Sequence, residues 1–353
     1  MHKQPTVYVG LSGGVDSSVA ALRLKKRGFT VVGVFIKVWH PEFMVCNWEA
    51  ERLDAMRVAA HLEIPFLTCD AVAAYRDEVA RYFISEYQAG RTPNPDVLCN
   101  KEVKFGAFLR FAKERGADFI ATGHYVQRIN TGTEEQLHRG IDTNKDQSYF
   151  LWSLSREQLA FSLFPVGDSN KALIRNEAAK AGIPTAEKKD SQGVCFLGHI
   201  DIPEFLSHYI DLVPGEVLNI QGDVVGTHRS ALVYTIGQRH GFALSNHDTM
   251  RQQHYIVAKD IERNTITVST EPILSAETDE IKLINTVLRC DLSPNEVLTA
   301  QFRYRQAPFK ISIIKSGDST LTVKLLEKTE KPASGQSCVI YQGSHCVGGG
   351  ILN

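Results

Sequence analysis

The chain has 353 residues, of which 43% are hydrophobic and 22% charged, and its formal net charge at pH 7 is −1. This length predicts two or three domains, and the composition is typical of a soluble globular protein with a sizeable core. A net charge this close to zero excludes a general electrostatic attraction for nucleic acid, so any such partner must be bound by a local basic patch.

The cysteines argue against a disulfide framework and against a zinc site. They are odd in number and contain no C-x-x-C pair. The first residues lead directly into an apolar strand, with no secretory signal, transit peptide or apolar span of membrane length. We therefore expect a cytosolic protein whose cysteines are either core residues or reactive thiols. The seven cysteines are Cys46, Cys69, Cys99, Cys195, Cys290, Cys338 and Cys346.

The first predicted unit is a buried strand at residues 6–9, a turn rich in glycine and serine, and a helix from about Asp16 to Gly28. Such a turn binds anions, because backbone N–H groups face the ligand and the helix N-terminus carries about +0.5 charge. The turn has neither the Lys-Ser/Thr pair of a Walker A loop nor the spacing of a G-x-G-x-x-G fingerprint. It resembles the SGGxDS pyrophosphate loop of ATP pyrophosphatases, although a tight strand-to-helix turn is the simpler alternative.

Strands and helices continue to alternate up to about residue 125. Parallel strands joined by helices indicate a doubly wound sheet, in which ligands bind at the carboxyl ends of the strands. The Gly10–Ser18 turn, Ile36-Lys37 and Gly123-His124 should therefore surround one crevice. Further strands are predicted at 29–36, 64–68 and 118–122, and helices at 49–62 (with Leu53, Met56, Val58 and Ala60 among its apolar positions), 71–87 and 101–115.

Two loops each contain a cysteine. Residues 90–100 contain two prolines and are predicted to be irregular, so that Cys99 lies just before the helix from Lys101, a position that lowers a thiol pKa. Residues 188–199 follow a predicted helix at 171–181 and place Cys195 between glycines, with two lysines upstream. A buried small hydrophobe is the alternative for each cysteine, and Cys69 and Cys338, in apolar runs, are predicted to be core residues.

The remainder of the chain is predicted to be rich in strands. A hairpin is expected at 125–129 and 136–139, short strands at 215–237, and alternating or apolar runs at 310–314, 320–325 and 336–341. We therefore predict an α/β catalytic domain over 1–199, a β-rich central module over 200–274 and a C-terminal β-barrel over 275–353.

Short segments distributed along nearly the whole chain resemble the tRNA-specific 2-thiouridylase family. They are GLSGGVDS (10–17), GRTPNPDVLCNK (90–101), ATGHY (121–125), NKDQSYF (144–150), GVCF (193–196), RYRQ (303–306) and GGGI (348–351). The resemblance implies a fold of the ATP pyrophosphatase type and 2-thiolation of the wobble uridine of tRNA. ATP would adenylate the C2 oxygen of the base, and sulfur from a cysteine persulfide would replace it.

The resemblance also implies roles for individual residues. Cys195 matches the persulfide carrier, Cys99 the nucleophile that attacks the persulfide and forms a disulfide with Cys195, and Asp96 the acid/base. Taken alone, Asp96 is better explained as a turn former after Pro95, but its position three residues before Cys99 favours a functional role. The positions that match ATP contacts are Gly10, Leu11, Ser12, Gly13, Gly14, Val15, Asp16, Ser17, Ile36 (where the family commonly has Met) and Gly123. The positions that match tRNA contacts are Asn94, Pro95, Asp96, His124, Lys145, Asp146, Gln147, Arg303, Tyr304 and Gln336.

The implied substrates are ATP with Mg²⁺ and the tRNA anticodon stem-loop, and the implied sulfur donor is a persulfide-donating sulfur-relay protein or a cysteine desulfurase. The enzyme itself is expected to be a monomer without a metal site of its own. Arg303-Tyr304-Arg305 combines a stacking ring with two cations, as single-stranded RNA requires, although a solvated strand face is an equal alternative. The competing functional hypothesis is an amide-forming adenylating enzyme on the same fold, with incidental cysteines. A non-catalytic RNA-binding protein is less compatible, because the phosphate-loop residues are intact.

Overall fold

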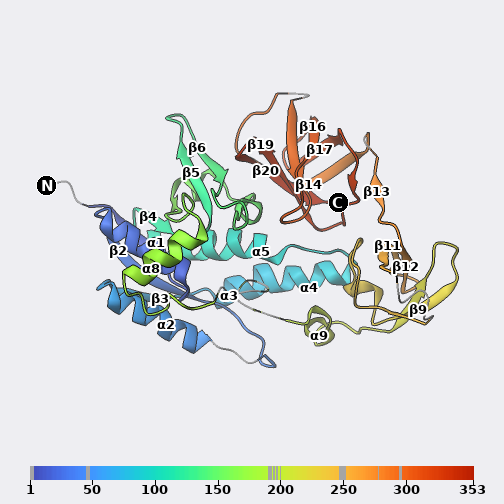
Figure 1. The fold of residues 1–353 in the computed structure, drawn as a ribbon, viewed down its shortest axis with the longest axis horizontal. Coiled ribbons are helices and arrows are strands. Elements are labelled where there is room, and N and C mark those ends of the chain that lie inside the picture. Colours follow the sequence, from blue (N-terminus) through green and yellow to red (C-terminus); the bar gives the residue numbers. More distant parts are fainter. Residues whose placement is uncertain are drawn as a thin grey trace.

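A computed structural model describes residues 4–44, 48–189, 193, 195, 198, 200–245, 252–276, 278–293 and 296–353. Figure 1 shows an N-terminal α/β unit, a closed C-terminal barrel and, beside the barrel, a small β-rich module. The predicted fold class is confirmed. Cys46, for which the sequence predicted no role, lies outside the described residues. None of the helices within the described residues has the length and apolar character needed to cross a membrane.

The α/β unit contains a parallel sheet with helices on both faces. Its strands lie in the order β3-β2-β1-β4-β7. Alternate residues of β1 and β2 enter two separate cores: Val7 and Val9 pack with α1, α2 and α8, whereas Tyr8 and Val34 pack beneath the helix that contains Cys99. The bounds are β1 Thr6–Gly10, α1 Val15–Lys26, β2 Thr30–Lys37, α2 Trp48–His61, β3 Phe66–Asp70, β4 Phe119–Ala121, α7 Arg156–Ala160, β7 Ser162–Leu163 and α8 Lys171–Lys180.

Two long helical runs cross one face of the sheet, and each contains a π-helical stretch. The first is α3 Val72–Ala74, η1 Tyr75–Ala80 and α4 Arg81–Gln88; the second is α5 Pro95–Leu98, η2 Cys99–Ala107 and α6 Phe108–Lys113. The prediction of an irregular segment up to residue 100 was therefore wrong at its end. Pro95 occupies the first turn of its helix, where its missing N–H has no helical partner to lose.

The apolar positions predicted for α2 were partly wrong. Leu53 and Met56 are 44% and 37% exposed, whereas Ala55, Val58 and Ala59 face the sheet. The helix packs on β2 through small side chains, which allow a close approach and leave its larger apolar residues near the edge of the contact.

The C-terminal barrel has six strands and is closed by pairing of β14 with β20. Gly348 lies at this junction, where a Cβ would be 1.8 Å from the carbonyl oxygen of Val287, so the glycine run permits the close approach. The predicted hairpin, β5 Val126–Asn130 and β6 Glu135–Arg139, joins the barrel through His138 and His345. The barrel strands are β14 Glu280–Leu288, β15 Val297–Gln301, β16 Phe309–Ser316, β17 Thr320–Leu325, β19 Ser337–Gln342 and β20 His345–Leu352.

The central module is a mixed sheet in the order β10-β9-β8-β12-β11, with β8 and β12 parallel. Its elements are α9 Ile202–Ser207, β8 Gly215–Leu218, β9 Val224–His228, η4 Ala231–Val233, β10 Ala243–Leu244, β11 Tyr255–Asp260 and β12 Thr265–Ser269. Short connecting elements are η3 Ser148–Leu151, β13 Leu274–Ser275 and β18 Thr329–Glu330.

Candidate active site

The turn between β1 and α1 has the geometry of an anion-binding loop. Gly13 has a φ of +69°, which glycine adopts without strain. Gly14 is the N-cap of α1 and has no side chain to cap the first-turn N–H groups. The Ser12 hydroxyl lies 3.3 Å from the Ser17 hydroxyl and accepts the N–H of Gly14 at 3.3 Å. Donors and hydroxyls thus converge where a phosphate group would bind.

A charged pair that the sequence did not reveal lies beside this loop. The Lys171 ammonium at the start of α8 lies 2.7 and 2.8 Å from the two carboxylate oxygens of Asp16, and the Tyr125 hydroxyl donates to the same carboxylate at 2.7 Å. Lys171 is more than 150 residues distant in sequence, so only the fold brings it to the loop. Asp16 is therefore held in place, and a cation lies within reach of a bound phosphate.

The ends of β1, β2 and β4 meet at one edge of the sheet, as the sequence predicts. The Ile36 side chain lies 3.6 Å from where a Cβ of Gly10 would be. A Cβ on Gly123 would lie 2.7 Å from the backbone nitrogen of Ser17, so this glycine permits contact between the loop and the strand end. Leu11 and Val15, predicted ATP contacts, have buried side chains and offer a ligand only their backbone groups.

Cys99 and Cys195, separated by 96 positions in sequence, lie side by side. Their sulfur atoms are 3.2 Å apart and both are free thiols, since a disulfide would bring them to about 2.05 Å. Asp96 accepts the N–H of Cys195 at 2.8 Å, and the Tyr75 hydroxyl donates to the carbonyl oxygen of Cys195 at 3.0 Å. Cys195 is thus held by both helical runs.

The pKa values of the two thiols are shifted in opposite directions. Burial raises the pKa of the Cys99 thiol well above its usual value, so this residue is the donor of the sulfur–sulfur hydrogen bond. That hydrogen bond, together with the ammonium of Lys104, lowers the pKa of the Cys195 thiol. Burial also raises the pKa of the Asp96 carboxyl. Of the two sulfurs, that of Cys195 therefore forms a thiolate more readily than that of Cys99.

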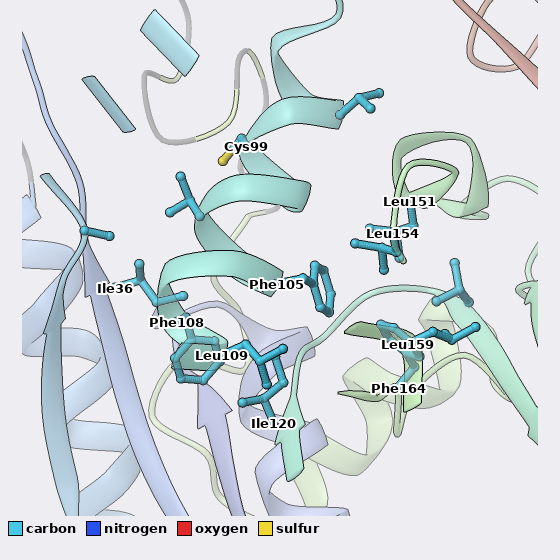
Figure 2. Packing of buried hydrophobic residues seen from close by; sticks show 14 of the residues in the cluster. Ile36, Cys99, Phe105, Phe108, Leu109, Ile120, Leu151, Leu154, Leu159 and Phe164 are labelled. Atoms are coloured by element: carbon cyan, nitrogen blue, oxygen red, sulfur yellow. The ribbon is translucent and has the colours of Figure 1, made fainter. Parts of the chain in front are cut away.

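The thiol pair, Cys99 and Cys195, packs against the same hydrophobic core as the carboxyl ends of the sheet strands beside the anion-binding loop. Figure 2 shows Cys99 on the same helical run as Phe105, Phe108 and Leu109, with Ile36 and Ile120 of the sheet beside them. The Phe108 ring lies 3.6 Å from the position of a Gly10 Cβ. This packing fixes the distance between the loop and the thiols. Cys69 and Cys338 are core residues, as predicted.

The predicted tRNA contacts fall into an interior group and a surface group. Asn94 accepts the N–H of Ser337 in the barrel at 2.6 Å, and the Gln147 side chain accepts the N–H of Tyr125 at 3.0 Å. His124 and Asp146 are buried: burial lowers the pKa of the His124 imidazole well below its usual value, and Asp146 pairs with Arg139 at 3.0 Å. Their contacts with tRNA stay predictions.

The surface group surrounds a groove on the barrel. The Tyr304 ring lies 4.6 Å from the ring of Phe150, so the 303–306 and 144–150 segments are neighbours. Arg303 pairs with Glu330 at 2.8 Å and donates to the carbonyl oxygen of Ile236 in the central module at 2.9 Å. The groove, with a volume of about 560 Å³, is lined by residues 303–309 and 327–330. Gln336 and Lys145 are both half-buried.

Comparison with known proteins gives one consistent result. Family models described as "tRNA methyl transferase HUP domain", "tRNA methyl transferase PRC-barrel domain" and "Aminomethyltransferase beta-barrel domain" match residues 5–199, 203–270 and 278–352. Proteins named "tRNA-specific 2-thiouridylase MnmA" from Listeria innocua and Bacillus subtilis are 42% and 41% identical to this chain. These alignments cover 98% and 100% of this chain, and 94% and 97% of the relatives. The chain therefore belongs to the tRNA-specific 2-thiouridylase family.

Proposed function

We propose that this protein catalyses ATP-dependent 2-thiolation of a tRNA uridine, as its family membership and the site together support. The observation on which the mechanism rests is the 3.2 Å contact between the Cys99 and Cys195 sulfurs, with the Asp96 side chain bound to the N–H of Cys195. Sulfur transfer needs a thiolate and a second thiol within reach, and no metal.

The first step uses the anion-binding loop. Residues 10–17 hold the phosphates of ATP, and Ile36 and Gly123 contact the adenine. The C2 oxygen of the uridine attacks the α-phosphorus, forms an O–P bond and displaces pyrophosphate. Asp96 moves a proton at the base as the O-adenylate forms or collapses. Mg²⁺ fits as an ion that arrives with ATP, since it binds through phosphates, water and one or two carboxylates, and Asp16 is the carboxylate in the loop.

The second step uses the thiol pair. Cys195 carries a persulfide, and its outer sulfur replaces the adenylated oxygen at C2, with AMP as the leaving group. Cys99 attacks the Cys195 sulfur and forms a Cys99–Cys195 disulfide, so that the outer sulfur departs with both bonding electrons. The disulfide must then be reduced before the next turnover.

The partners follow from this chemistry. We propose the tRNA anticodon stem-loop as the RNA substrate, a persulfide-carrying relay protein or cysteine desulfurase as the sulfur donor, a monomeric enzyme, and a cytosolic location where thiols stay reduced. The catalytic domain is assigned to 1–199, the central module to 200–274 and the barrel to 275–353. The RNA contacts are assigned to Asn94, Pro95, Asp96, His124, Lys145, Asp146, Gln147, Arg303, Tyr304 and Gln336.

The alternative, an amide-forming adenylating enzyme, is not favoured. It leaves the thiol pair without a role, although that pair is held by Tyr75 and Asp96 from two separate helical runs.

Pyrophosphate release distinguishes the two functions. We expect release from ATP only when unmodified tRNA is present, with no stimulation by small carboxylic acids and amine donors. The Tyr304→Ala variant should need several times more tRNA for half-maximal release, since base stacking on an aromatic ring contributes about 1–3 kcal/mol. Release that is independent of tRNA would overturn the proposal.

A further inference from the structure

Lys104 lies at the thiol pair, although the sequence analysis assigned it no role. It is half-buried in the π-helical stretch η2, five residues after Cys99. Its ammonium lies close enough to Cys195, Cys99 and Asp96 to interact with all three. A lysine that gives up part of its hydration must be stabilised by negative charge, and these three residues can each carry one.

The π-helical stretch explains how Lys104 reaches this position. In an α-helix, residues five apart are separated by about 140° around the axis, because there are 3.6 residues per turn. In η2 the backbone bonds span five residues, as the N–H of Phe108 shows by donating to the carbonyl of Val103. Residues five apart then lie much closer together around the axis than in an α-helix. The wide turn thus places Lys104 on the same side of the helix as Cys99.

The groups that face the Cys195 sulfur can be named individually. Cys99 and Lys104 stabilise negative charge on it, and Asp96 opposes that charge. Tyr75 lies close to both thiols but its hydroxyl donates to the Cys195 backbone. Burial, together with the charge of Lys104, lowers the pKa of the His124 imidazole well below its usual value, so it adds no second cation. Lys104 is therefore the one cation among these described neighbours.

We propose that Lys104 is a catalytic residue that holds the Cys195 sulfur as an anion for the step that loads it with sulfur. This proposal rests on the proposed function. The Cys195 thiolate attacks the outer sulfur of a donor persulfide R–S–SH, forms a new S–S bond and breaks the donor S–S bond. Cys195–S–SH results, and the donor leaves as RS⁻. The proton stays on the transferred sulfur, and no external oxidant or reductant is required. Lys104 also stabilises the persulfide anion that forms when Cys195–S–SH loses this proton.

The test is the pH dependence of Cys195 alkylation by iodoacetamide in the full-length protein, measured by peptide mass spectrometry without tRNA or ATP. In the wild type, the apparent pKa of Cys195 should lie below the ordinary thiol value of about 8.5. Lys104→Met should raise the apparent pKa of Cys195 by about one unit or more, since a neighbouring opposite charge shifts a pKa by about 1–3 units. The alkylation rate near neutral pH should fall at least about threefold, because a more basic thiolate is partly compensated by greater nucleophilicity.

Matched variants separate charge from structure. Lys101→Met removes a lysine of the same helix whose ammonium pairs with Glu102 at 3.3 Å, and should leave the titration unchanged. Lys104→Arg keeps the charge and should restore the low value. Cys69 and Cys338, both buried, are internal controls, because they stay unlabelled in folded protein.

Two results would overturn the proposal. One is a wild-type Cys195 that titrates at or above the ordinary thiol value, which decides the matter even if Lys104→Met does not fold. The other is a folded Lys104→Met variant whose Cys195 keeps the wild-type apparent pKa, or a folded Lys104→Arg variant whose Cys195 does not. If the apparent pKa of Cys195 depends on the charge at position 104 but the enzyme makes no 2-thiouridine, the proposed function is contradicted. The interaction between Lys104 and Cys195 is not.

Discussion

Asp96 combines two demands within one side chain. It accepts the N–H of Cys195 and so positions that residue, and its half-buried carboxyl lies next to the thiols. Burial penalises the charged form and raises the pKa of the carboxyl, a condition that suits proton transfer at a base but costs stability. The fold therefore needs the hydrogen-bond acceptor of Asp96, whereas the reaction needs its ionisable proton.

Asp96→Asn keeps the acceptor and removes the ionisable proton, so it should affect stability and activity differently. The amide oxygen can still accept the Cys195 N–H, so we expect a Tm at pH 7 equal to or higher than that of the wild type and a loss of thiolation of about 10²-fold or more. The folded pKa is raised, so the native state holds more protons than the unfolded state between the two pKa values, and wild-type stability falls as pH rises through that interval. The Tm advantage of the variant should therefore grow from pH 4 upward.

Thermal melts at several pH values, with 2-thiouridine assayed in parallel, check this prediction. Asp96→Ala, which removes the acceptor as well, is the control and should melt below the wild type. A variant Asp96→Asn that is markedly less stable at every pH would show that the carboxylate is a structural anchor alone.

At the scale of elements, the close approach of the strand β4 to the phosphate loop depends on Gly123. A methyl group there would meet the backbone of Ser17 and Asp16 at 2.7 and 2.8 Å. Backbone atoms cannot move aside as a flexible side chain can, so the loop itself must shift.

Gly123→Ala should therefore raise the KM for ATP in tRNA-dependent pyrophosphate release by about tenfold or more, while the protein still folds. Gly116→Ala is the matched control. It lies before β4, where a Cβ meets nothing within 4 Å, and its φ of +76° should cost about 1 kcal/mol of stability without changing the KM. Equal effects of the two variants on the KM would contradict the role given to Gly123.

Local sequence signals predicted much of the fold, and their failures have physical causes. The strand-loop-helix at residues 6–28 was visible because glycine spacing and apolar runs are local properties. The start of the helix at Pro95 was missed because proline is both a helix breaker and a favoured first-turn residue. The roles of Lys104 and Lys171 could not be predicted, because a π-helical turn and a contact across 155 positions are set by tertiary packing.

At the scale of the whole molecule, Arg289 ties the barrel to the catalytic unit. Its guanidinium is buried and donates to the carbonyl oxygens of Trp152, Leu154 and Cys346. The first two follow η3 in the catalytic unit and the third lies in β20 of the barrel. Thr92, just upstream of the thiol helix, donates its N–H to Ser334 of the barrel at 2.9 Å. These contacts tie the position of the barrel to that of the helix that contains Cys99.

Arg289→Met should lower the free energy of unfolding by about 3 kcal/mol or more, because each buried carbonyl that loses its donor costs about 1–3 kcal/mol. Chemical denaturation followed by tryptophan fluorescence measures this, since Trp152 lies at the junction. Arg263→Met is the control: this arginine is 84% exposed beside Asp260 and its loss should change stability by less than about 0.5 kcal/mol. A difference of under 1 kcal/mol between the two variants would show that the junction is held by other contacts.

The most direct measurement of the proposed reaction is single-turnover formation of 2-thiouridine. It uses ATP, unmodified tRNA and a persulfide donor with the wild type, Cys99→Ser and Cys195→Ser, and detects the product after nuclease digestion. We predict 2-thiouridine from the wild type alone, while both variants still release pyrophosphate in the presence of tRNA. Variants that thiolate tRNA as fast as the wild type would contradict the account, because the two sulfurs 3.2 Å apart would then be structural.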